Sequence, residues 1–289
     1  MGDCRDPDRL ARLKQRLADA ASGGAQVVVL PELILHEYFC IEENRRHFDL
    51  AQSPDDPLLA ELGALAGKHG MALVLPFFEK RAAGLYHNSA MVFDADGTRL
   101  GIYRKMHIPD DPGFYEKYYF TPGDAAGPEG GFRVFQTRFG RIGVLICWDQ
   151  WFPEGARLTA LQGCDLLVYP TAIGWDDRET EGIASGEGAA LDAKWLDAWA
   201  VMHRSHAIAN GLYVAAVNRV GREGHLRFWG NTLICDPGGG ILGRLGDSEE
   251  STLFADINPA EIESHRRTWP FLRDRRIDAY QGLLRRHSS

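Results

Sequence analysis

Residues 143–151 read GVLICWDQW, an apolar run that stops on a cysteine where an aromatic and acidic cluster begins. A short apolar run of this kind is typical of a buried strand. A cysteine inside such a run would be an ordinary core residue, because free cysteine is among the most buried side chains. At the carboxyl end of a strand, however, it occupies the place where open α/β sheets bind their ligands. Cys147 is therefore the first candidate for a functional residue.

The 289-residue chain has the composition of an ordinary globular protein, with 45% hydrophobic residues and a mean hydropathy of −0.26. Its formal net charge of −8 argues against a nucleic-acid partner, which requires a basic face. No apolar stretch approaches the ~20 residues that cross a bilayer and no signal-peptide core opens the chain, so no membrane partner is expected. The five cysteines are scattered without a CxxC pair, which favours a reduced, cytoplasmic setting.

Strand and helix patterns alternate along the chain. An amphipathic helix is expected over residues 8–22, and further helices over residues 57–69, 154–162 and 192–209. Strands are expected over residues 27–30, 72–78, 88–93, 98–104, 133–136, 141–146, 165–169, 212–217, 232–235 and 241–245. The acidic, glycine- and alanine-rich stretch 176–190 is predicted to be a surface loop. This order predicts one α/β sandwich domain over residues 1–289.

Three predicted strands, or the turns that follow them, deliver a reactive side chain: Glu32, Lys105 and Cys147. A thiol attacks only as the thiolate and needs a nearby base or cation. A glutamate in a dry pocket has a raised pKa and can take that proton near neutral pH, while a lysine can stabilise an oxyanion. Taken singly, each has a plain alternative: Lys105 as a surface charge, Glu32 as a helix-cap acid, Cys147 as core packing.

The segments around these residues resemble the three catalytic boxes of the nitrilase superfamily of carbon–nitrogen hydrolases. They are residues 30–40 (LPELILHEYFC), 103–124 (YRKMHIPDDPGFYEKYYFTPGD) and 146–154 (ICWDQWFPE). Later family segments are matched by residues 205–210 (SHAIAN), 218–221 (NRVG) and 271–280 (FLRDRRIDAY). The resemblance therefore spans nearly the whole chain from about residue 8.

The resemblance implies a four-layer α-β-β-α sandwich and a Glu-Lys-Cys triad. By position in the boxes, Glu32 is the general base, Lys105 the oxyanion stabiliser and Cys147 the nucleophile. Glu116 matches a second family glutamate that orients the site. The backbone N–H of Trp148, the residue after the nucleophile, is the other expected oxyanion donor.

Tyr38, Asp149 and Trp151 in these boxes are candidates for substrate binding, as are Trp175 and Trp229 near the expected cleft. For the tryptophans, plain core packing is the alternative. The resemblance implies a linear N-carbamoyl amine, such as N-carbamoylputrescine, as the substrate. Several carboxylates near the cleft would favour its cationic tail, unless they are simply solvated loop residues: Asp110, Asp111, Asp149, Asp176, Asp177 and Glu179. Other substrate classes remain open on the same triad, namely primary amides and nitriles, as does an inactive scaffold that retains the fold.

No metal or organic cofactor is expected. His36, Glu37 and Cys40 have side chains of the type that zinc sites use, and His203 and His206 lie three residues apart on a predicted helix. Neither group reproduces an HExxH or CxxC spacing. The only expected partners are the small-molecule substrate and further copies of the chain.

The two ends of the chain carry the last expectations. The C-terminal segment 265–289 holds apolar residues among arginines, which favours burial at the interface of a homodimer or larger assembly. Family members usually open with a short apolar strand, whereas this chain opens MGDCRDPDRL. Residues 1–7 are therefore predicted to be irregular, and one sheet to lack its usual first strand.

Overall fold

The structure, a computed structural model, describes residues 7–180 and 185–287. The α-helices in this part of the chain are α1 (Pro7–Ser22), α2 (Pro57–Lys68), α3 (Glu116–Tyr119), α4 (Pro153–Leu161), α5 (Ser185–Asn210) and α6 (Pro259–Thr268). The strands are β1 (Val27–Val29), β2 (Ala72–Ala82), β3 (Leu85–Phe93), β4 (Arg99–Arg104), β5 (Arg133–Thr137), β6 (Gly140–Val144), β7 (Leu166–Thr171), β8 (Gly174–Asp176), β9 (Tyr213–Asn218), β10 (Arg222–Glu223), β11 (Leu226–Phe228), β12 (Leu233–Cys235) and β13 (Ile241–Arg244).

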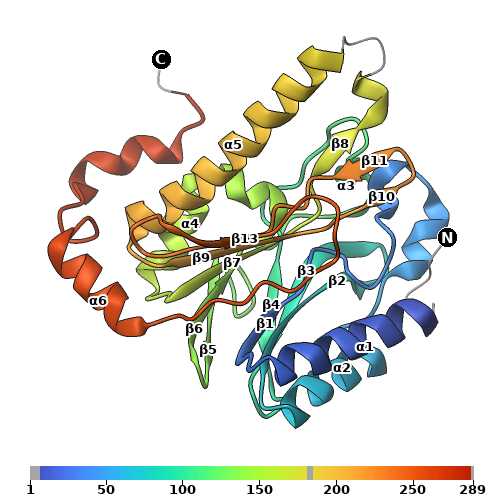
Figure 1. Cartoon of the computed structure of the whole chain (residues 1–289), viewed down its shortest axis with the longest axis horizontal. Coiled ribbons are helices and arrows are strands. Elements are labelled where there is room, and N and C mark those ends of the chain that lie inside the picture. The colour runs from blue at the N-terminus through green and yellow to red at the C-terminus, as the bar shows by residue number, and fades with distance from the viewer. Residues whose placement is uncertain (1–6, 181–184, 288–289) are drawn as a thin grey trace.

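Two sheets pack face to face and are covered by helices on their outer sides (Figure 1). The first sheet has the order β1-β2-β3-β4, and the second has the order β13-β12-β9-β7-β6-β5. Helices α1 and α2 lie on the outer face of the first sheet, while α4 and α5 cover the second. A small sheet, β10-β11-β8, lies beside them. The predicted α-β-β-α sandwich is confirmed.

Strand β2 shows how the sequence fixes these layers. Leu73 and Leu75 pack toward the outer helices in a core that includes Leu62 of α2. Val74, between them, faces the second sheet and packs in a core that includes Val144 of β6. Successive side chains of a strand point to opposite faces, and here both faces are buried. This two-sided burial explains why β2 begins as an uninterrupted apolar run.

Two predicted boundaries are wrong. Helix α5 begins at Ser185, Asp176 ends β8, and the 3-10 helix η4 covers Asp177–Thr180, so most of the predicted loop 176–190 has regular structure. Each glycine disfavours a helix by ~1 kcal/mol relative to alanine, but the alanines beside them favour it, and the helix continues into residues that pack in the core of the second sheet, such as Trp199. Pro7 is the first residue of α1 rather than irregular, and the rest of the stretch 1–7 lies outside the described residues.

Strand β1 has one free edge. Among residues 7–180 and 185–287, β2 is its single neighbouring strand, paired in parallel. The carbonyl oxygen of Gln26 accepts a hydrogen bond from Ala72 N, and Leu30 N donates to the carbonyl of Val74. The backbone groups that bond to β2 are therefore those of the even-numbered residues in the stretch 26–30. Alternate residues of a strand direct their N–H and C=O groups to opposite sides. Those of Val27 and Val29 therefore face away from β2.

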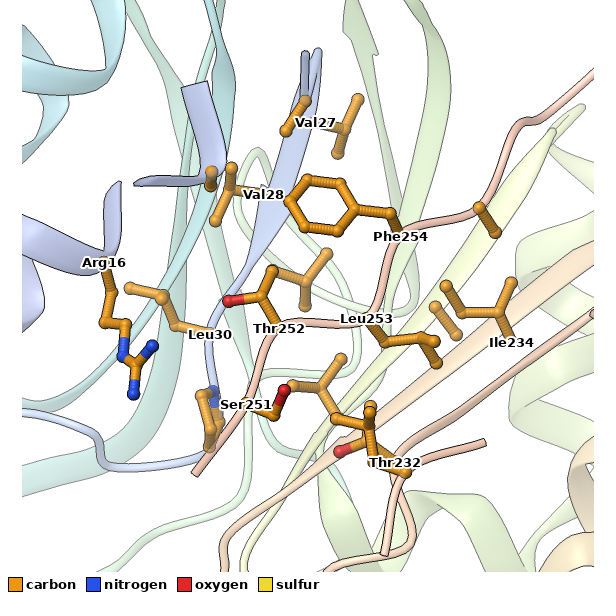
Figure 2. A pocket seen from close by; sticks show the side chains of 18 of the residues that line it. Arg16, Val27, Val28, Leu30, Thr232, Ile234, Ser251, Thr252, Leu253 and Phe254 are labelled. Atoms are coloured by element: carbon orange, nitrogen blue, oxygen red, sulfur yellow. The ribbon is translucent and has the colours of Figure 1, made fainter. Parts of the chain in front are cut away.

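The extended segment 251–257 lies across this free edge, and a groove of about 700 Å³ separates the two (Figure 2). Figure 2 shows the Phe254 ring pointing toward Val28 of β1. No backbone–backbone hydrogen bond within the described residues joins 251–257 to another segment. No described strand precedes α1, so the groove is bordered by two backbone edges without strand partners.

Candidate active site

Three turns bring the predicted catalytic side chains together. Glu32 follows β1, Lys105 directly follows β4, and Cys147 opens the short 3-10 helix η3 (Cys147–Trp151) after β6. Lys105 Nζ donates to Glu32 Oε1 at 2.8 Å and to Glu116 Oε2 at 2.7 Å. The side chains of Glu32, Lys105 and Glu116 are fully buried, and Cys147 is 4% exposed. One lysine therefore bridges two carboxylates in a dry pocket.

The charges of this cluster act on the Cys147 thiol. Burial raises the pKa of Cys147 well above its usual range, and the negative charge of Glu32 raises it further. The positive charge of Lys105 lowers it without reversing the direction. The resting thiol is therefore protonated near neutral pH, and it needs a base before it can attack.

Glu32 has one oxygen engaged and one available. Its Oε1 accepts from Lys105 Nζ and, at 2.6 Å, from Asn88 Nδ2. Its Oε2 is buried and has no hydrogen-bond partner among the described residues. A buried carboxylate oxygen without a donor is costly and calls for an explanation, such as a catalytic role. Oε2 is thus available to accept a proton, while Oε1 fixes the orientation of the carboxylate.

Glu116 is the second carboxylate on Lys105. Tyr38 Oη donates to Glu116 Oε1 at 2.8 Å, and both side chains are buried. Burial raises the pKa of Glu116 to about 7, with the charge of Lys105 opposing this shift and that of Glu32 adding to it. Tyr38, predicted to bind substrate, is instead placed to orient Glu116.

The backbone is strained at two positions of the site. Cys147 has φ of 43° and Leu33, next to Glu32, has φ of 50°. A non-glycine residue in this left-handed region costs roughly 1–2 kcal/mol, and such residues cluster at active sites. The turn of Cys147 is braced by Asp149, whose Oδ2 accepts from Ile146 N at 2.9 Å and from Tyr103 Oη at 2.7 Å.

The other oxygen of Asp149 is also occupied. Oδ1 accepts from His107 N at 3.0 Å and lies 2.7 Å from His107 Nδ1. The His107 ring stacks on Phe152 with ring centroids 3.8 Å apart. Asp149 is fully buried with both oxygens committed to protein donors. This placement supports a bracing role and does not support the predicted contact with substrate.

The carbon-nitrogen hydrolase family model matches residues 4–267, which include every residue of this cluster. The chain belongs to the carbon–nitrogen hydrolase family. The resemblance to the nitrilase superfamily drawn from the sequence boxes is confirmed, and the protein is a carbon–nitrogen hydrolase enzyme.

Similar proteins cover almost the whole of this carbon–nitrogen hydrolase. An N-carbamoylputrescine amidase of Solanum lycopersicum is 41% identical over 280 residues, covering 93% of this chain and 88% of the relative. A citrullinase of Francisella tularensis subsp. tularensis is 38% identical over 287 residues, covering 98% of this chain and 94% of the relative. The crystal structure of a carbon-nitrogen hydrolase from Helicobacter pylori G27 has a TM-score of 0.89 and 43% identity to this chain. The match covers 99% of this chain and 96% of the chain in that structure.

The tryptophans predicted to line the hydrolase site have different environments. Trp175 and Trp229 pack together with ring centroids 4.6 Å apart, and buried Trp229 Nε1 has no acceptor among the described residues. Trp151 packs edge-on against Trp195, which makes plain packing a sufficient explanation for it. Trp148 is half-buried as the second residue of η3. The first N–H groups of a helix have no partner within it, which suits the predicted oxyanion role of Trp148 N.

Sequence reasoning missed two residues of the hydrolase cluster. Asn88 opens a predicted strand and was assigned no role, yet its Nδ2 bonds Glu32 and lies 3.4 Å from Glu116 Oε2. Arg219 belongs to the matched NRVG segment, and its guanidinium contacts the backbone around Glu32. A polar residue at the start of the predicted apolar strand 88–93, which lies inside β3, is the signal that could have found the first. For Arg219 the matched segment was the signal, but its contact lies 187 residues away in the chain.

His203 and His206 serve the core. His206 Nδ1 lies 2.7 Å from Tyr169 Oη, and His203 Nδ1 lies 2.8 Å from the carbonyl of Trp199. Burial lowers the pKa of His203 to about 3 and that of His206 to about 4, so both are neutral. Within residues 7–180 and 185–287, no group of three or more potential ligands could hold a metal ion. In the same ranges, no helix has the length and apolarity to cross a membrane.

Proposed function

We propose that the protein hydrolyses the ureido group of a linear N-carbamoyl amine, with N-carbamoylputrescine as the first candidate. The chemistry rests most on one observation, the lysine shared by two buried carboxylates whose charges act on Cys147. The substrate class rests on the relatives, since N-carbamoylputrescine and citrulline both end in a ureido group. The amine product would then be putrescine, which places the reaction in polyamine synthesis.

The first half-reaction forms a covalent intermediate. Glu32 Oε2 accepts the thiol proton while Cys147 Sγ attacks the ureido carbon. Lys105 Nζ and the backbone N–H of Trp148 donate hydrogen bonds to the oxyanion that forms. Collapse of this tetrahedral species breaks the bond to the terminal nitrogen. Glu32 returns the proton to that nitrogen, so ammonia leaves and a thiocarbamate remains on Cys147.

The second half-reaction releases the product. Glu32 takes a proton from water, and the hydroxide attacks the thiocarbamate carbon with the same oxyanion donors in place. The C–S bond breaks, the Cys147 thiol regains its proton, and a carbamate leaves. The carbamate then decays to carbon dioxide and the free amine. Every proton is carried by Glu32, so this route uses no step on a metal or organic cofactor.

Three of the six carboxylates expected to hold a cationic tail are bonded to other groups of the protein. Asp176 is fully buried at its side chain and bonded to Arg178, with Nη2 at 2.5 Å from Oδ2. Asp177 forms an ion pair with Arg222. Because Asp149 is also committed, local carboxylates give less support to a cationic tail than the sequence suggested. The preference for N-carbamoylputrescine therefore rests mainly on the relatives that carry its name.

Citrulline is the second candidate, and a different arginine, Arg227, favours it. Arg227 is the register partner of Trp175 in the β11–β8 ladder, close to the Trp175–Trp229 pair. Its Nη2 lies 3.1 Å from Asp192 Oδ2. Mixed positive and negative side chains of this kind suit the zwitterionic end of an amino acid. The relative named citrullinase covers 98% of this chain.

Ammonia release from matched compounds tests the proposal. We expect the highest kcat/KM for N-carbamoylputrescine, compared with citrulline, N-carbamoyl-β-alanine, a primary amide and a nitrile. A ratio of N-carbamoylputrescine to N-carbamoyl-β-alanine at or below one would overturn the cationic-tail preference. Higher turnover of the amide or nitrile would instead favour an ω-amidase-like or nitrile-cleaving enzyme.

An inactive scaffold is distinguished by the reactivity of Cys147. A nucleophile with a base beside it is alkylated faster than the buried cysteines Cys40, Cys164 and Cys235, and its alkylation stops turnover. Equal, slow labelling of all four would favour the scaffold. These cysteines are free in the structure, which supports the proposed reduced, cytoplasmic setting.

Assembly is a further part of the proposal. Apolar side chains remain exposed along the C-terminal segment, including Trp269, Ile277 and Leu284, which are 56%, 70% and 91% exposed. Figure 1 shows this segment extending away from α1 and α2 along one side of the molecule. An exposed apolar surface of this kind is typical of an interface. We therefore expect a homodimer or larger homo-oligomer that uses residues 265–289.

A further inference from the structure

Arg219 reaches from the second sheet to the turn that carries Glu32. It directly follows β9 and is 5% exposed. Its Nε donates to the carbonyl of Glu32 at 3.0 Å, and its Nη2 donates to the carbonyl of His36 at 2.8 Å and to that of Leu33. A single guanidinium therefore satisfies three carbonyl groups of one turn.

This turn has few bonds of its own to hold its shape. Its internal hydrogen bond runs from His36 N to the carbonyl of Leu33 at 3.1 Å. Leu33 is held in the left-handed region, where an L residue is unfavourable without external support. The planar fork of a guanidinium can bond several acceptors at fixed angles, whereas a lysine ammonium is a point donor on a flexible stem. The contact is therefore specific to arginine.

Arg219 is itself fixed on its other side. Its Nη1 donates to Glu223 Oε1 at 2.8 Å and to Oε2 at 2.9 Å, and its guanidinium carbon lies 5.7 Å from the centre of the Phe228 ring. Glu223 Oε2 also accepts from the backbone N–H of Tyr38. Because the Tyr38 hydroxyl donates to Glu116, this network reaches both carboxylates that bind Lys105.

The two halves of the catalytic cluster come from different sheets. Glu32 and Lys105 follow strands of the first sheet, whereas Cys147 follows β6 of the second. Arg219 follows β9, which belongs to the second sheet together with β6. We propose that Arg219 is a positioning residue that holds Glu32 in register with Cys147 across the two sheets. The inference rests on the proposed function, in which Glu32 takes the thiol proton.

The test measures alkylation of Cys147 by chloroacetamide alongside turnover. Arg219→Lys is expected to lower kcat by about ten-fold or more with KM nearly unchanged, since a misplaced base weakens proton transfer. The same change should slow labelling of Cys147, followed by mass spectrometry of its peptide, to a similar degree. Arg204→Lys is the matched control, because Arg204 Nε donates to the carbonyl of Gly239 far from the cluster. Its rates should equal those of the unaltered protein.

A double-mutant cycle separates positioning from general stability. In a Glu32→Gln background, Arg219→Lys should leave the labelling rate changed by less than about two-fold, because the residue it acts through is gone. A full second loss in that background, or unchanged labelling and kcat in Arg219→Lys alone, would overturn the proposal.

A second variant covers the case in which Arg219→Lys does not fold. Glu223→Gln keeps the guanidinium but weakens its support, and it should slow labelling by about three-fold with the same dependence on Glu32. Normal labelling in a folded Glu223→Gln protein would count against the inference. Labelling does not require the true substrate. Slower labelling in the Arg219 variant therefore upholds the inference even if no ureido compound is hydrolysed.

Discussion

Strand β1 borders two unlike regions of the molecule. At its carboxyl end the chain enters the catalytic cluster, where Glu32 is bonded through its side chain to Lys105 and Asn88 and through its carbonyl to Arg219. Along its free edge, Val27 and Val29 face a groove with no strand beside them among the described residues. A densely hydrogen-bonded turn and a sheet edge without a strand partner thus lie only a few residues apart.

This difference shows that the site and the sheet edge depend on separate contacts. The turn at Glu32 is held by the side chains of Asn88 in β3, Lys105 after β4 and Arg219 after β9, not by the hydrogen-bond ladder of β1. Changes in the cluster should therefore alter catalysis with modest effects on stability. Changes at the groove should alter stability with little effect on catalysis.

Removing the triad is the strongest way to test this separation. Cys147→Ala should abolish turnover, and Glu32→Gln and Lys105→Met should each lower kcat by at least ~100-fold, as for loss of a general base or an oxyanion donor. The Cys147→Ala protein should melt near the unaltered protein, because only a thiol is removed. Ammonia release and thermal melts check both statements. Substantial turnover by Cys147→Ala would end the covalent mechanism.

The pH dependence sharpens the role of Glu116. Burial raises the pKa of Glu116 to about 7, so kcat/KM should have an acidic limb with an apparent pKa near 7. Glu116→Gln should lower kcat about ten-fold and remove this limb, since the carboxyl group that titrates there is gone. A limb near pH 7 that persists in Glu116→Gln would contradict this assignment.

The same shift has a consequence for stability with a definite sign. Because the folded-state pKa of Glu116 is raised, the folded protein binds a proton that the unfolded chain releases above its ordinary value of 4.5. The stabilisation is present below that value and is lost as the pH rises through about 7. Denaturant titrations of Glu116→Gln should show a weaker loss of stability over this window.

A change at the groove should affect stability and leave catalysis nearly unchanged. Adding a short apolar strand ahead of residue 1 should raise the melting temperature by several degrees, since ~1 kcal/mol corresponds to about 2–4 °C in a chain of this size. The kcat should change by less than about two-fold if the two regions are independent. The control carries proline at alternate positions of the added strand, which removes its backbone donors. An unchanged melting temperature would mean that the fold already compensates at this edge.

The smallest effect on catalysis is expected from the C-terminal segment. Replacing both Ile277 and Leu284 by serine should reduce the mass measured by light scattering at micromolar concentration toward that of a monomer. The kcat should remain within about two-fold, because neither residue contacts the cluster or the groove. A monomeric unaltered protein would show that these side chains do not form an interface.

The sequence allowed the catalytic residues to be predicted because they lie at the ends of strands. Glu32, Lys105 and Cys147 each follow an apolar strand, and the ends of strands are where side chains reach a cleft. The sandwich was also predictable, because two-sided burial leaves long apolar runs such as that of β2. The start of α5 was missed because a composition rich in glycine and alanine occurs both in loops and in the first turns of a long helix.

The supports of the site were harder to predict from sequence. An aspartate beside a nucleophile looks the same whether it faces substrate or, like Asp149, the backbone of its own turn. Asn88 and Arg219 act on Glu32 through contacts that only the folded chain creates, and a local pattern contains no sign of the partner. Side chains that hold other side chains therefore need a three-dimensional structure to be found.

The free edge of β1 should also affect the hydrogen-exchange rates of its individual backbone amides. The N–H of Leu30 donates to β2, and the parallel register gives Val28 the same direction, whereas those of Val27 and Val29 face the groove. In hydrogen–deuterium exchange, the first pair should exchange only when the sheet opens, and the second pair directly from the folded protein. NMR should therefore find slow and fast amides alternating along a single three-residue strand and its exit.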